Sequence, residues 1–403
     1  MSETLRKLRP FELARWQIDR DRERMRRLPL LLARKQQRMA ASPFAFLRGS
    51  APLFYRVLRN APRLARGPED EGLLSGDLHL ENFGAYRPDR PASRGDRVVF
   101  DLNDLDEAFH GHLHLDLLRV LTSVLLAARG WGCSSPDALA LAGELLDGYR
   151  RMRSSGRAPA VPRPVSELVE RVAARKRREL LAHRTHGIGD RRRFRIGPTL
   201  LRLPRGVRTA CARGFARFAR EEMARAGHPP DRFRVLDVAF RVAGTGSLGT
   251  FRVAVLVEGH GAPDGAWMFD LKTMGESAGL AFATRRTDPG PERVVNALRT
   301  LLRHPPVMLG TVHVLGHGLL VRRLTPQEDR LDWATLRPEQ RAPTLGYLGA
   351  LTAAAHRRGT RGKLARLDGA QGRRLLRSAT ELAGMHEAVA LAYAAETRSH
   401  GLE

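Results

Sequence analysis

The spacing of apolar residues divides this chain into a helical first part, a β-rich section and a helical end. Residues 1–40 are polar, rich in arginine and helical in period, and residues 44–58 continue as a short amphipathic helical stretch. Helical spacing returns over residues 116–130, and Ser135 followed by Pro136 predicts the N-cap and first position of another helix. These patterns predict a mainly helical first part.

Two segments within this part predict a β-hairpin. Residues 75–86 and 97–109 contain short apolar runs joined by a polar loop at residues 87–96. Acidic residues gather at the ends of both segments. Because loops at strand ends commonly carry functional side chains, we expect a site here.

Past the middle of the chain, short apolar runs alternate with turn residues. The runs at residues 235–240, 250–259 and 267–272 predict three strands, and residues 291–304 predict a helix. A second hairpin follows at residues 307–324, and the remainder of the chain is helical in pattern.

The composition is that of a globular protein, with 42% hydrophobic and 28% charged residues. Two cysteines, Cys133 and Cys211, are too few for a disulfide framework and indicate a reducing compartment. The longest apolar stretch, residues 121–128, is far short of the roughly 20 residues that span a bilayer. We therefore expect a cytoplasmic protein with no membrane partner.

The net charge of +26 is unevenly spread, because residues 150–235 hold 24 basic and seven acidic residues. Two further helical stretches, near residues 166–184 and 207–226, carry this charge. Such a field favours anions, including nucleic acid, although few aromatic residues are available there to stack bases. A solvated face of arginine-rich helices explains the charge equally well, and nucleic acid is not the favoured partner.

The first chemical motif is GDxHxxN, running from Gly76 to Asn82 and followed by Asp101 at the end of an apolar run. Phosphoryl transfer needs one carboxylate to orient a hydroxyl group, and an amide oxygen and a second carboxylate to hold magnesium. The alternative is an Asp-rich turn in which the asparagine is bonded locally.

The second motif is GxGxxG, from Gly244 to Gly249. A dinucleotide fingerprint would open a helix here, whereas this sequence continues as a strand, so the loop lies within a β-hairpin. Its backbone N–H groups can then approach phosphates. Lys272, one of only five lysines, ends the next apolar run and is placed to reach phosphates, or else is a strand-end residue with a solvated ammonium group.

These motifs together resemble the protein-kinase-like superfamily, especially its aminoglycoside-phosphotransferase branch. The segments SPFAFLRG, GDLHLENFG, FDLNDLDEA and GTGSLGT, with the Lys272 strand, are more closely similar to the bacterial domain-of-unknown-function 2252 family. This resemblance covers most of residues 40–360. It implies a kinase-like fold with ATP and Mg²⁺, and no known substrate.

The order of the motifs differs from that of a kinase, because the GDxHxxN loop precedes the glycine loop by about 170 residues. We therefore interpret the fold as α+β, a protein-kinase-like two-lobe fold that is circularly permuted, with a mainly helical catalytic lobe first and a β-rich nucleotide lobe second. The permutation predicts that His356 lies close to residues 74–77. The expected parts are an N-terminal helical segment (1–70), a helical catalytic lobe with a basic insertion (71–230), a β-rich nucleotide-binding lobe (231–330) and C-terminal helices that complete the catalytic lobe (331–403).

The resemblance implies roles for the first motif. Asp77 is the catalytic base or hydroxyl-orienting residue, His79 orients the loop, and Asn82 and Asp101 are magnesium ligands. Asp104 competes with Asp101 for the metal, since its spacing to a later structural aspartate, Asp116 in this sequence, fits the superfamily better.

The resemblance also implies a nucleotide site. The residues that it brings to the phosphates, besides Lys272, are Gly244, Gly246, Ser247 and Gly249. The carboxylate partner of Lys272 is left open, because Thr273 and Asn296 stand where the family usually has glutamates. Glu276 and Glu292 are the remaining candidates. This departure leaves a nucleotide-binding pseudokinase as an alternative.

Two other classes of protein also fit part of the sequence. His110, His112 and His114 alternate, so a strand could bring them to one face as zinc ligands. The basic segment alone would serve a non-catalytic protein that binds anions or nucleic acid.

The expected activity is therefore that of an ATP- and magnesium-dependent, kinase-like phosphotransferase. The acceptor is not identified by any motif. Helical insertions recognise the acceptor in this superfamily, so we expect its surface within residues 105–230, and the arginines there favour an anionic acceptor.

Overall fold

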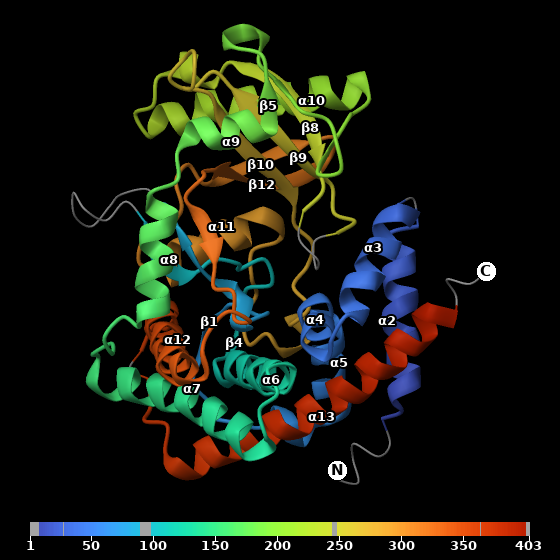
Figure 1. Cartoon of the computed structure of the whole chain (residues 1–403), viewed down its shortest axis with the longest axis vertical. Helices are drawn as coiled ribbons and strands as arrows, with labels where there is room; N and C mark the ends of the chain where they lie inside the picture. The colour runs from blue at the N-terminus through green and yellow to red at the C-terminus, as the bar shows by residue number, and fades with distance from the viewer. Residues whose placement is uncertain (1–7, 27, 89–97, 244–247, 363, 400–403) are drawn as a thin grey trace.

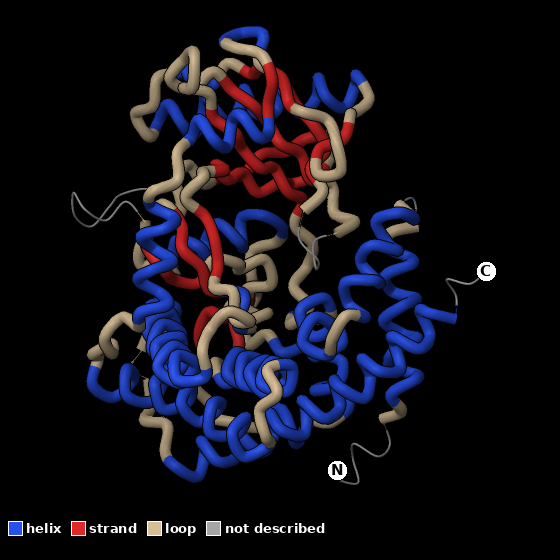
Figure 2. Tube along the Cα trace, in the orientation of Figure 1, coloured by secondary structure: helices blue, strands red, loops and turns tan. Residues whose placement is uncertain are grey.

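The chain folds into two lobes, one built on an antiparallel sheet and the other almost entirely helical (Figures 1 and 2). The structure is a computed structural model that describes residues 8–26, 28–88, 98–243, 248–362 and 364–399. Its mixture of long helices and antiparallel strands confirms the α+β class.

The helices account for most of the chain. In order they are α2 (Pro10–Arg24), α3 (Pro29–Ala40), α4 (Pro43–Gly49), α5 (Ala51–Asn60), α6 (His114–Gly130), α7 (Ser135–Ser155), α8 (Arg163–Ala173), α9 (Arg177–Arg184), α10 (Arg205–Phe218), α11 (Gly290–Leu301), α12 (Pro338–Gly359) and α13 (Gly369–Ser399).

Within the described residues, the strands form one large sheet and three small ones. In order they are β1 (Glu71–Leu74), β2 (Phe83–Tyr86), β3 (Val99–Leu102), β4 (Phe109–His112), β5 (Thr185–His186), β6 (Arg193–Phe194), β7 (Leu200–Leu201), β8 (Val235–Arg241), β9 (Arg252–Val257), β10 (Trp267–Thr273), β11 (Gly310–Val314), β12 (His317–Leu324) and β13 (Glu328–Arg330).

The large sheet has the strand order β11-β12-β10-β9-β8-β7. This order confirms the three predicted strands β8, β9 and β10 and the predicted hairpin of β11 and β12. One face is covered by α10, whose Phe215 and Phe218 pack against Phe269 of β10 and its neighbours. On the other face, Leu181 of α9 packs against Met268. Both covering helices come from residues that precede position 231.

The helical lobe surrounds α6, whose residues from His114 to Ala128 are all buried. Helix α7 packs against both α6 and α12, and α13 crosses beneath α6 (Figure 1). The predicted hairpin is present as β2 and β3, and β13 extends it to three strands. The pairing of β1 with β4 was not predicted, because each strand has only four residues.

The local signal at Ser135 and Pro136 predicted the start of α7 to within one residue. The N-cap of α7 is Ser134 rather than Ser135, because the Ser134 hydroxyl accepts a hydrogen bond from the N–H of Asp137 at 3.3 Å. Pro136 is then the second helical residue, where a missing N–H is equally tolerated. Among the described residues, no helix combines the length and the apolar character that a membrane crossing needs.

Candidate active site

A cleft of about 1060 Å³ lies between the two lobes and brings the GDxHxxN loop together with Lys272 of β10. Its lining is rich in charged side chains from elements far apart in the sequence. Those from the two motifs and their surroundings are Asp77, His79, Glu81, Asn82, Asp104, Asp106, Glu107, Arg252, Asp270, Lys272 and Glu276.

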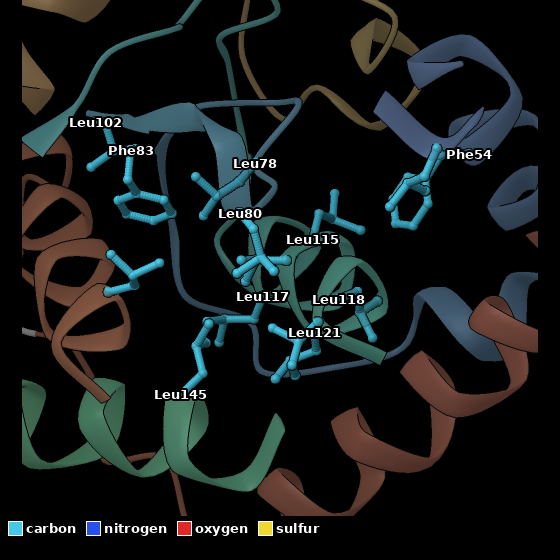
Figure 3. Packing of buried hydrophobic residues seen from close by; sticks show 14 of the residues in the cluster. Phe54, Leu78, Leu80, Phe83, Leu102, Leu115, Leu117, Leu118, Leu121 and Leu145 are labelled. Atoms are coloured by element: carbon cyan, nitrogen blue, oxygen red, sulfur yellow. The ribbon is translucent and has the colours of Figure 1, made fainter. Parts of the chain in front are cut away.

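The GDxHxxN loop enters this cleft through a turn that requires glycine. Gly76 has φ of +79°, and a Cβ atom there would lie 1.9 Å from the carbonyl oxygen of Glu107. The following residues alternate in direction. Leu78 and Leu80 are buried over the leucines of α6 (Figure 3), so Asp77 and His79 face the cleft.

A buried carboxylate fixes the backbone just before Asp77. Asp116 accepts hydrogen bonds from the N–H groups of Ser75 at 2.8 Å and Gly76 at 2.9 Å. His356 Nε2 lies 3.2 Å from the same carboxylate, and its Nδ1 lies 3.1 Å from the Tyr149 hydroxyl. The predicted proximity of His356 to residues 74–77 is confirmed. The permutation that suggested it stays a proposal.

Asp77 is held by an arginine that sequence reasoning did not find. Arg119 of α6 is fully buried, and its Nε donates to Asp77 Oδ1 at 2.5 Å. The same guanidinium donates to the Leu47 carbonyl at 2.8 Å and lies 4.9 Å from the Phe54 ring centre. Burial raises the pKa of Asp77 to about 7, although Arg119 opposes this rise. An arginine within an otherwise apolar helix is the signal that would have pointed to it.

His79 and Asn82 hold the loop in shape. His79 Nδ1 accepts a hydrogen bond from the N–H of Glu81 at 3.2 Å, and burial lowers the pKa of the imidazole well below its usual value. The ring is therefore neutral at physiological pH. Asn82 Nδ2 donates to the carbonyl of Asp77 at 2.7 Å, which leaves the Asn82 amide oxygen available to a ligand.

Of the three aspartates within and after β3, two line the cleft. Asp101 lies outside its lining, and its carboxylate is 3.5 Å from the Arg358 guanidinium. Asp104 and Asp106 both line it, and Asp106 is in direct contact with Lys272. Burial and the neighbouring Asp106 raise the pKa of Asp104. Burial also opposes the ionisation of Asp106, but Lys272 outweighs it and holds the Asp106 pKa below its usual value.

Lys272 is therefore paired with Asp106. It is not paired with Glu276 or Glu292, the two candidates from the sequence. Glu276 lines the same cleft but forms no ion pair with Lys272. Glu292 lies in the first turn of α11, outside the cleft lining. The physical reason is that residues 103–107 turn toward the end of β10 and place Asp106 against Lys272. Glu292 of α11 does not line this part of the cleft.

The glycine loop is only partly described. Gly244, Gly246 and Ser247 lie outside the described residues. Gly249 has φ of +89°, and a Cβ atom there would lie 2.5 Å from Cγ of Met25 in the turn after α2.

The sheet presents a charged surface to the cleft beside Lys272. Asp270 of β10 accepts a hydrogen bond from Arg252 Nε at 2.8 Å, and Arg241 Nη1 lies 3.1 Å from Oδ1 of the same carboxylate. Burial opposes ionisation of Asp270, but Arg252 and Arg241 hold its pKa well below the usual value. A surface with this many ionised groups favours polar and charged ligands over apolar ones.

The alternating histidines do not form a metal site. His114 begins α6, and its ring nitrogens lie 2.9 Å and 2.6 Å from the carbonyl oxygens of Pro68 and Ala65. His112 and His114 stack with ring centres 5.8 Å apart. In the described part of the chain, no group of three or more His, Cys, Asp or Glu side chains is arranged to hold a metal ion.

The acceptor surface expected within residues 105–230 contributes little to the cleft. Of the described residues in that range, only Asp106 and Glu107 line it. Helix α7 packs beneath α12, and α9 and α10 cover the sheet, so their outer faces point away. Helices α2, α3 and α4, which lie together in Figure 1, supply another wall, and residues of β12 and β13 also line the cleft.

These features define an α+β protein with a charged cleft between a sheet lobe and a helical lobe. The chain belongs to the bacterial family described as uncharacterized protein conserved in bacteria (DUF2252), whose model matches residues 27–400. No curated protein and no solved structure matches the chain.

Proposed function

We propose that this protein is an ATP- and magnesium-dependent phosphotransferase with a circularly permuted, kinase-like fold. The observation that carries the proposal is the meeting of Lys272 and Asp106 in a cleft that also contains Asp77, Asn82 and Asp104. These residues come from segments separated by about 165 positions, and phosphoryl transfer requires this combination of a cation, metal-binding oxygens and a carboxylate.

The donor set fits magnesium. Mg²⁺ is usually bound by one or two carboxylates together with water and substrate phosphates, so a dedicated cluster of protein ligands is not needed. Asp104 and the amide oxygen of Asn82 would hold it, with Asp106 nearby. When bound, the metal would neutralise charge on the phosphates.

The chain's own residues then have distinct tasks. Lys272 offers its ammonium group to phosphate oxygens, and Asp77 orients the acceptor hydroxyl group. As the bond from the terminal phosphorus to the bridging oxygen breaks, its electrons stay with the nucleoside diphosphate. A new bond forms from phosphorus to the acceptor oxygen, and the hydroxyl proton passes to Asp77.

Replacing Lys272 with methionine is expected to abolish stabilisation by ATP and magnesium. A ligand present at 100 times its Kd stabilises the folded state by about 2.7 kcal/mol, which raises Tm by several degrees. Methionine keeps most of the side-chain length but removes the charge. The measurement is thermal unfolding with and without ATP and magnesium, and each variant is compared with its own ligand-free state because Asp106 loses its partner.

The matched control is Lys176→Met, an exposed lysine outside the cleft, which should keep the full shift. An unchanged shift in Lys272→Met would contradict the proposed nucleotide site. A normal shift in the wild type without any transfer activity would instead indicate a nucleotide-binding pseudokinase.

The two candidate metal aspartates can be separated by titrating magnesium at a fixed nucleotide concentration. We expect Asp104→Asn to raise the magnesium concentration needed for nucleotide binding by about tenfold or more, because it removes a charged ligand. Asp101→Asn should leave it unchanged, since Asp101 faces Arg358 outside the cleft. The reverse result would assign the metal to Asp101.

A further inference from the structure

The wall of the cleft opposite the sheet is formed by N-terminal helices that no sequence motif pointed to. The residues of α2, α3 and α4 that line it are Gln17, Arg20, Asp21, Arg24, Lys35, Arg38, Ala45, Arg48 and Gly49. This wall is strongly basic, and its position beside the GDxHxxN loop makes it part of the same cleft.

A buried polar core holds α2 against α3. Lys35 Nζ lies 2.5 Å from Asp21 Oδ1, and Gln17 Nε2 donates to Asp21 Oδ2 at 3.1 Å. All three side chains are buried. Because a buried ion pair is unfavourable unless its geometry is well fixed, this core fixes the register of the two helices. Lys35 and Asp21 also neutralise each other, so the charge offered to the cleft comes from arginines.

The helix pair is also attached to the glycine-loop hairpin. Met25, in the turn after α2, is buried in one apolar cluster with Val242 and Leu248 of the sheet lobe. Leu31 and Leu32 of α3 pack against the same cluster. The basic wall is therefore fixed relative to Val242 and Leu248, which flank the glycine loop.

Arg20 and Arg24 lie one turn apart on α2 and share the face that lines the cleft. Neither forms an ion pair or side-chain hydrogen bond with another residue that the structure describes. Arg20 is partly buried, and burial, together with the charge of Arg24, lowers its pKa. Two neighbouring guanidinium groups in a cleft are stabilised by an anion, and arginine is the side chain best shaped to bind phosphate or carboxylate.

The wall that carries these arginines adjoins the GDxHxxN loop through α4, against which α3 packs. Arg48 of α4 forms an ion pair with Glu81 of that loop at 2.7 Å, and Arg119, which holds Asp77, donates to the Leu47 carbonyl of α4. Lys272, by contrast, lies on β10 of the sheet lobe and contacts Asp106. An anion on α2 would therefore sit near the acceptor's end of the cleft.

We propose that the wall formed by α2 and α3 is the acceptor site, and that Arg20 and Arg24 bind a phosphate or carboxylate group of a small hydroxylated acceptor. This inference rests on the proposed phosphotransferase function and adds the class of acceptor. The cleft volume of about 1060 Å³ is slightly larger than that of most small-molecule sites, which span roughly 300–1,000 Å³, so a nucleotide and a second ligand can fit together.

The test uses inorganic phosphate as the probe for the anionic group. We expect calorimetric titration to show phosphate binding to the wild-type protein saturated with ADP and magnesium. Arg20→Gln/Arg24→Gln should weaken phosphate binding by at least about tenfold, since two charge-assisted contacts are lost, and should leave the Kd for ADP within about twofold. The charge-matched control is Arg22→Gln/Arg26→Gln, at exposed positions outside the cleft lining, which should change neither constant.

Other results of these titrations would refute the anion site, the acceptor assignment or the phosphotransferase proposal. Undiminished phosphate binding in Arg20→Gln/Arg24→Gln, or none in the wild type, would refute the anion site. Loss of ADP binding in that variant would show that the arginines bind the nucleotide's own phosphates and would refute the acceptor assignment. If ADP fails to bind the wild type, the phosphotransferase proposal falls, and the same titration without ADP still decides whether Arg20 and Arg24 bind phosphate.

Discussion

Asp77→Asn is expected to lower the rate of magnesium-dependent ATP hydrolysis by about 10²–10⁴-fold, with water in place of the unidentified acceptor. This is the usual contribution of a positioned general base. Asparagine keeps an oxygen that the buried Arg119 can contact, so the variant should fold, yet it cannot accept the proton. The measurement is phosphate release at saturating ATP, together with the Kd for ATP, which should change by less than about threefold.

The pH dependence of the wild-type rate tests the same residue. Burial raises the pKa of Asp77 to about 7, and only the ionised carboxylate can accept a proton. The rate should therefore be low at acidic pH, rise with a midpoint near 7 and level off above it. Asp147→Asn, which removes an exposed carboxylate from α7, should reproduce the wild-type profile. A wild-type rate in Asp77→Asn would exclude Asp77 as the base.

Much of the fold was predictable because its signals are local. The strands β8, β9 and β10 are short apolar runs bounded by turn residues, and the hairpins join segments that are close in sequence. The pairing of β1 with β4 was not predictable in this way. It joins two four-residue strands separated by more than 30 positions, and nothing in either pattern specifies the partner.

The motifs of the candidate site were predictable, but the carboxylate that contacts Lys272 was not. Asp77 and Asn82 line the cleft as expected, whereas Asp101 does not. The alternation Asp104-Leu105-Asp106 contains a usable signal, because Leu105 is buried and the two aspartates then face the same side. Choosing between them as the partner of Lys272 requires the three-dimensional path of the chain.

The basic wall was missed for a different reason. Arg20 and Arg24 lie in an arginine-rich helix in which every face carries charge, so periodicity does not separate the cleft side from the solvent side. Their position depends on the buried pair of Asp21 and Lys35 and on the contact of Met25 with the sheet lobe. Neither contact follows from local sequence.

Asp116→Ala is expected to lower the free energy of unfolding by about 3–5 kcal/mol. Asp116 is 1% exposed and accepts hydrogen bonds from two backbone N–H groups, while His356 lies against the same carboxylate. Alanine would leave these buried groups without a partner, and breaking a buried charged network costs about that much. Urea unfolding can be followed by the fluorescence of Trp131 and Trp333, which stack in the helical lobe with ring centres 5.5 Å apart.

Tyr149→Phe is the matched comparison, because it removes only the hydroxyl that contacts His356 and Arg153 and should cost about 1–2 kcal/mol. A smaller loss in Asp116→Ala than in Tyr149→Phe would show that the carboxylate does not organise the network.

The milder Asp116→Asn variant adds a functional readout. Asp116 does not line the cleft, yet it fixes the backbone that precedes Asp77. Its loss should therefore reduce ATP hydrolysis much more than ATP binding, because Lys272 and Asp104 lie on elements that Asp116 does not touch.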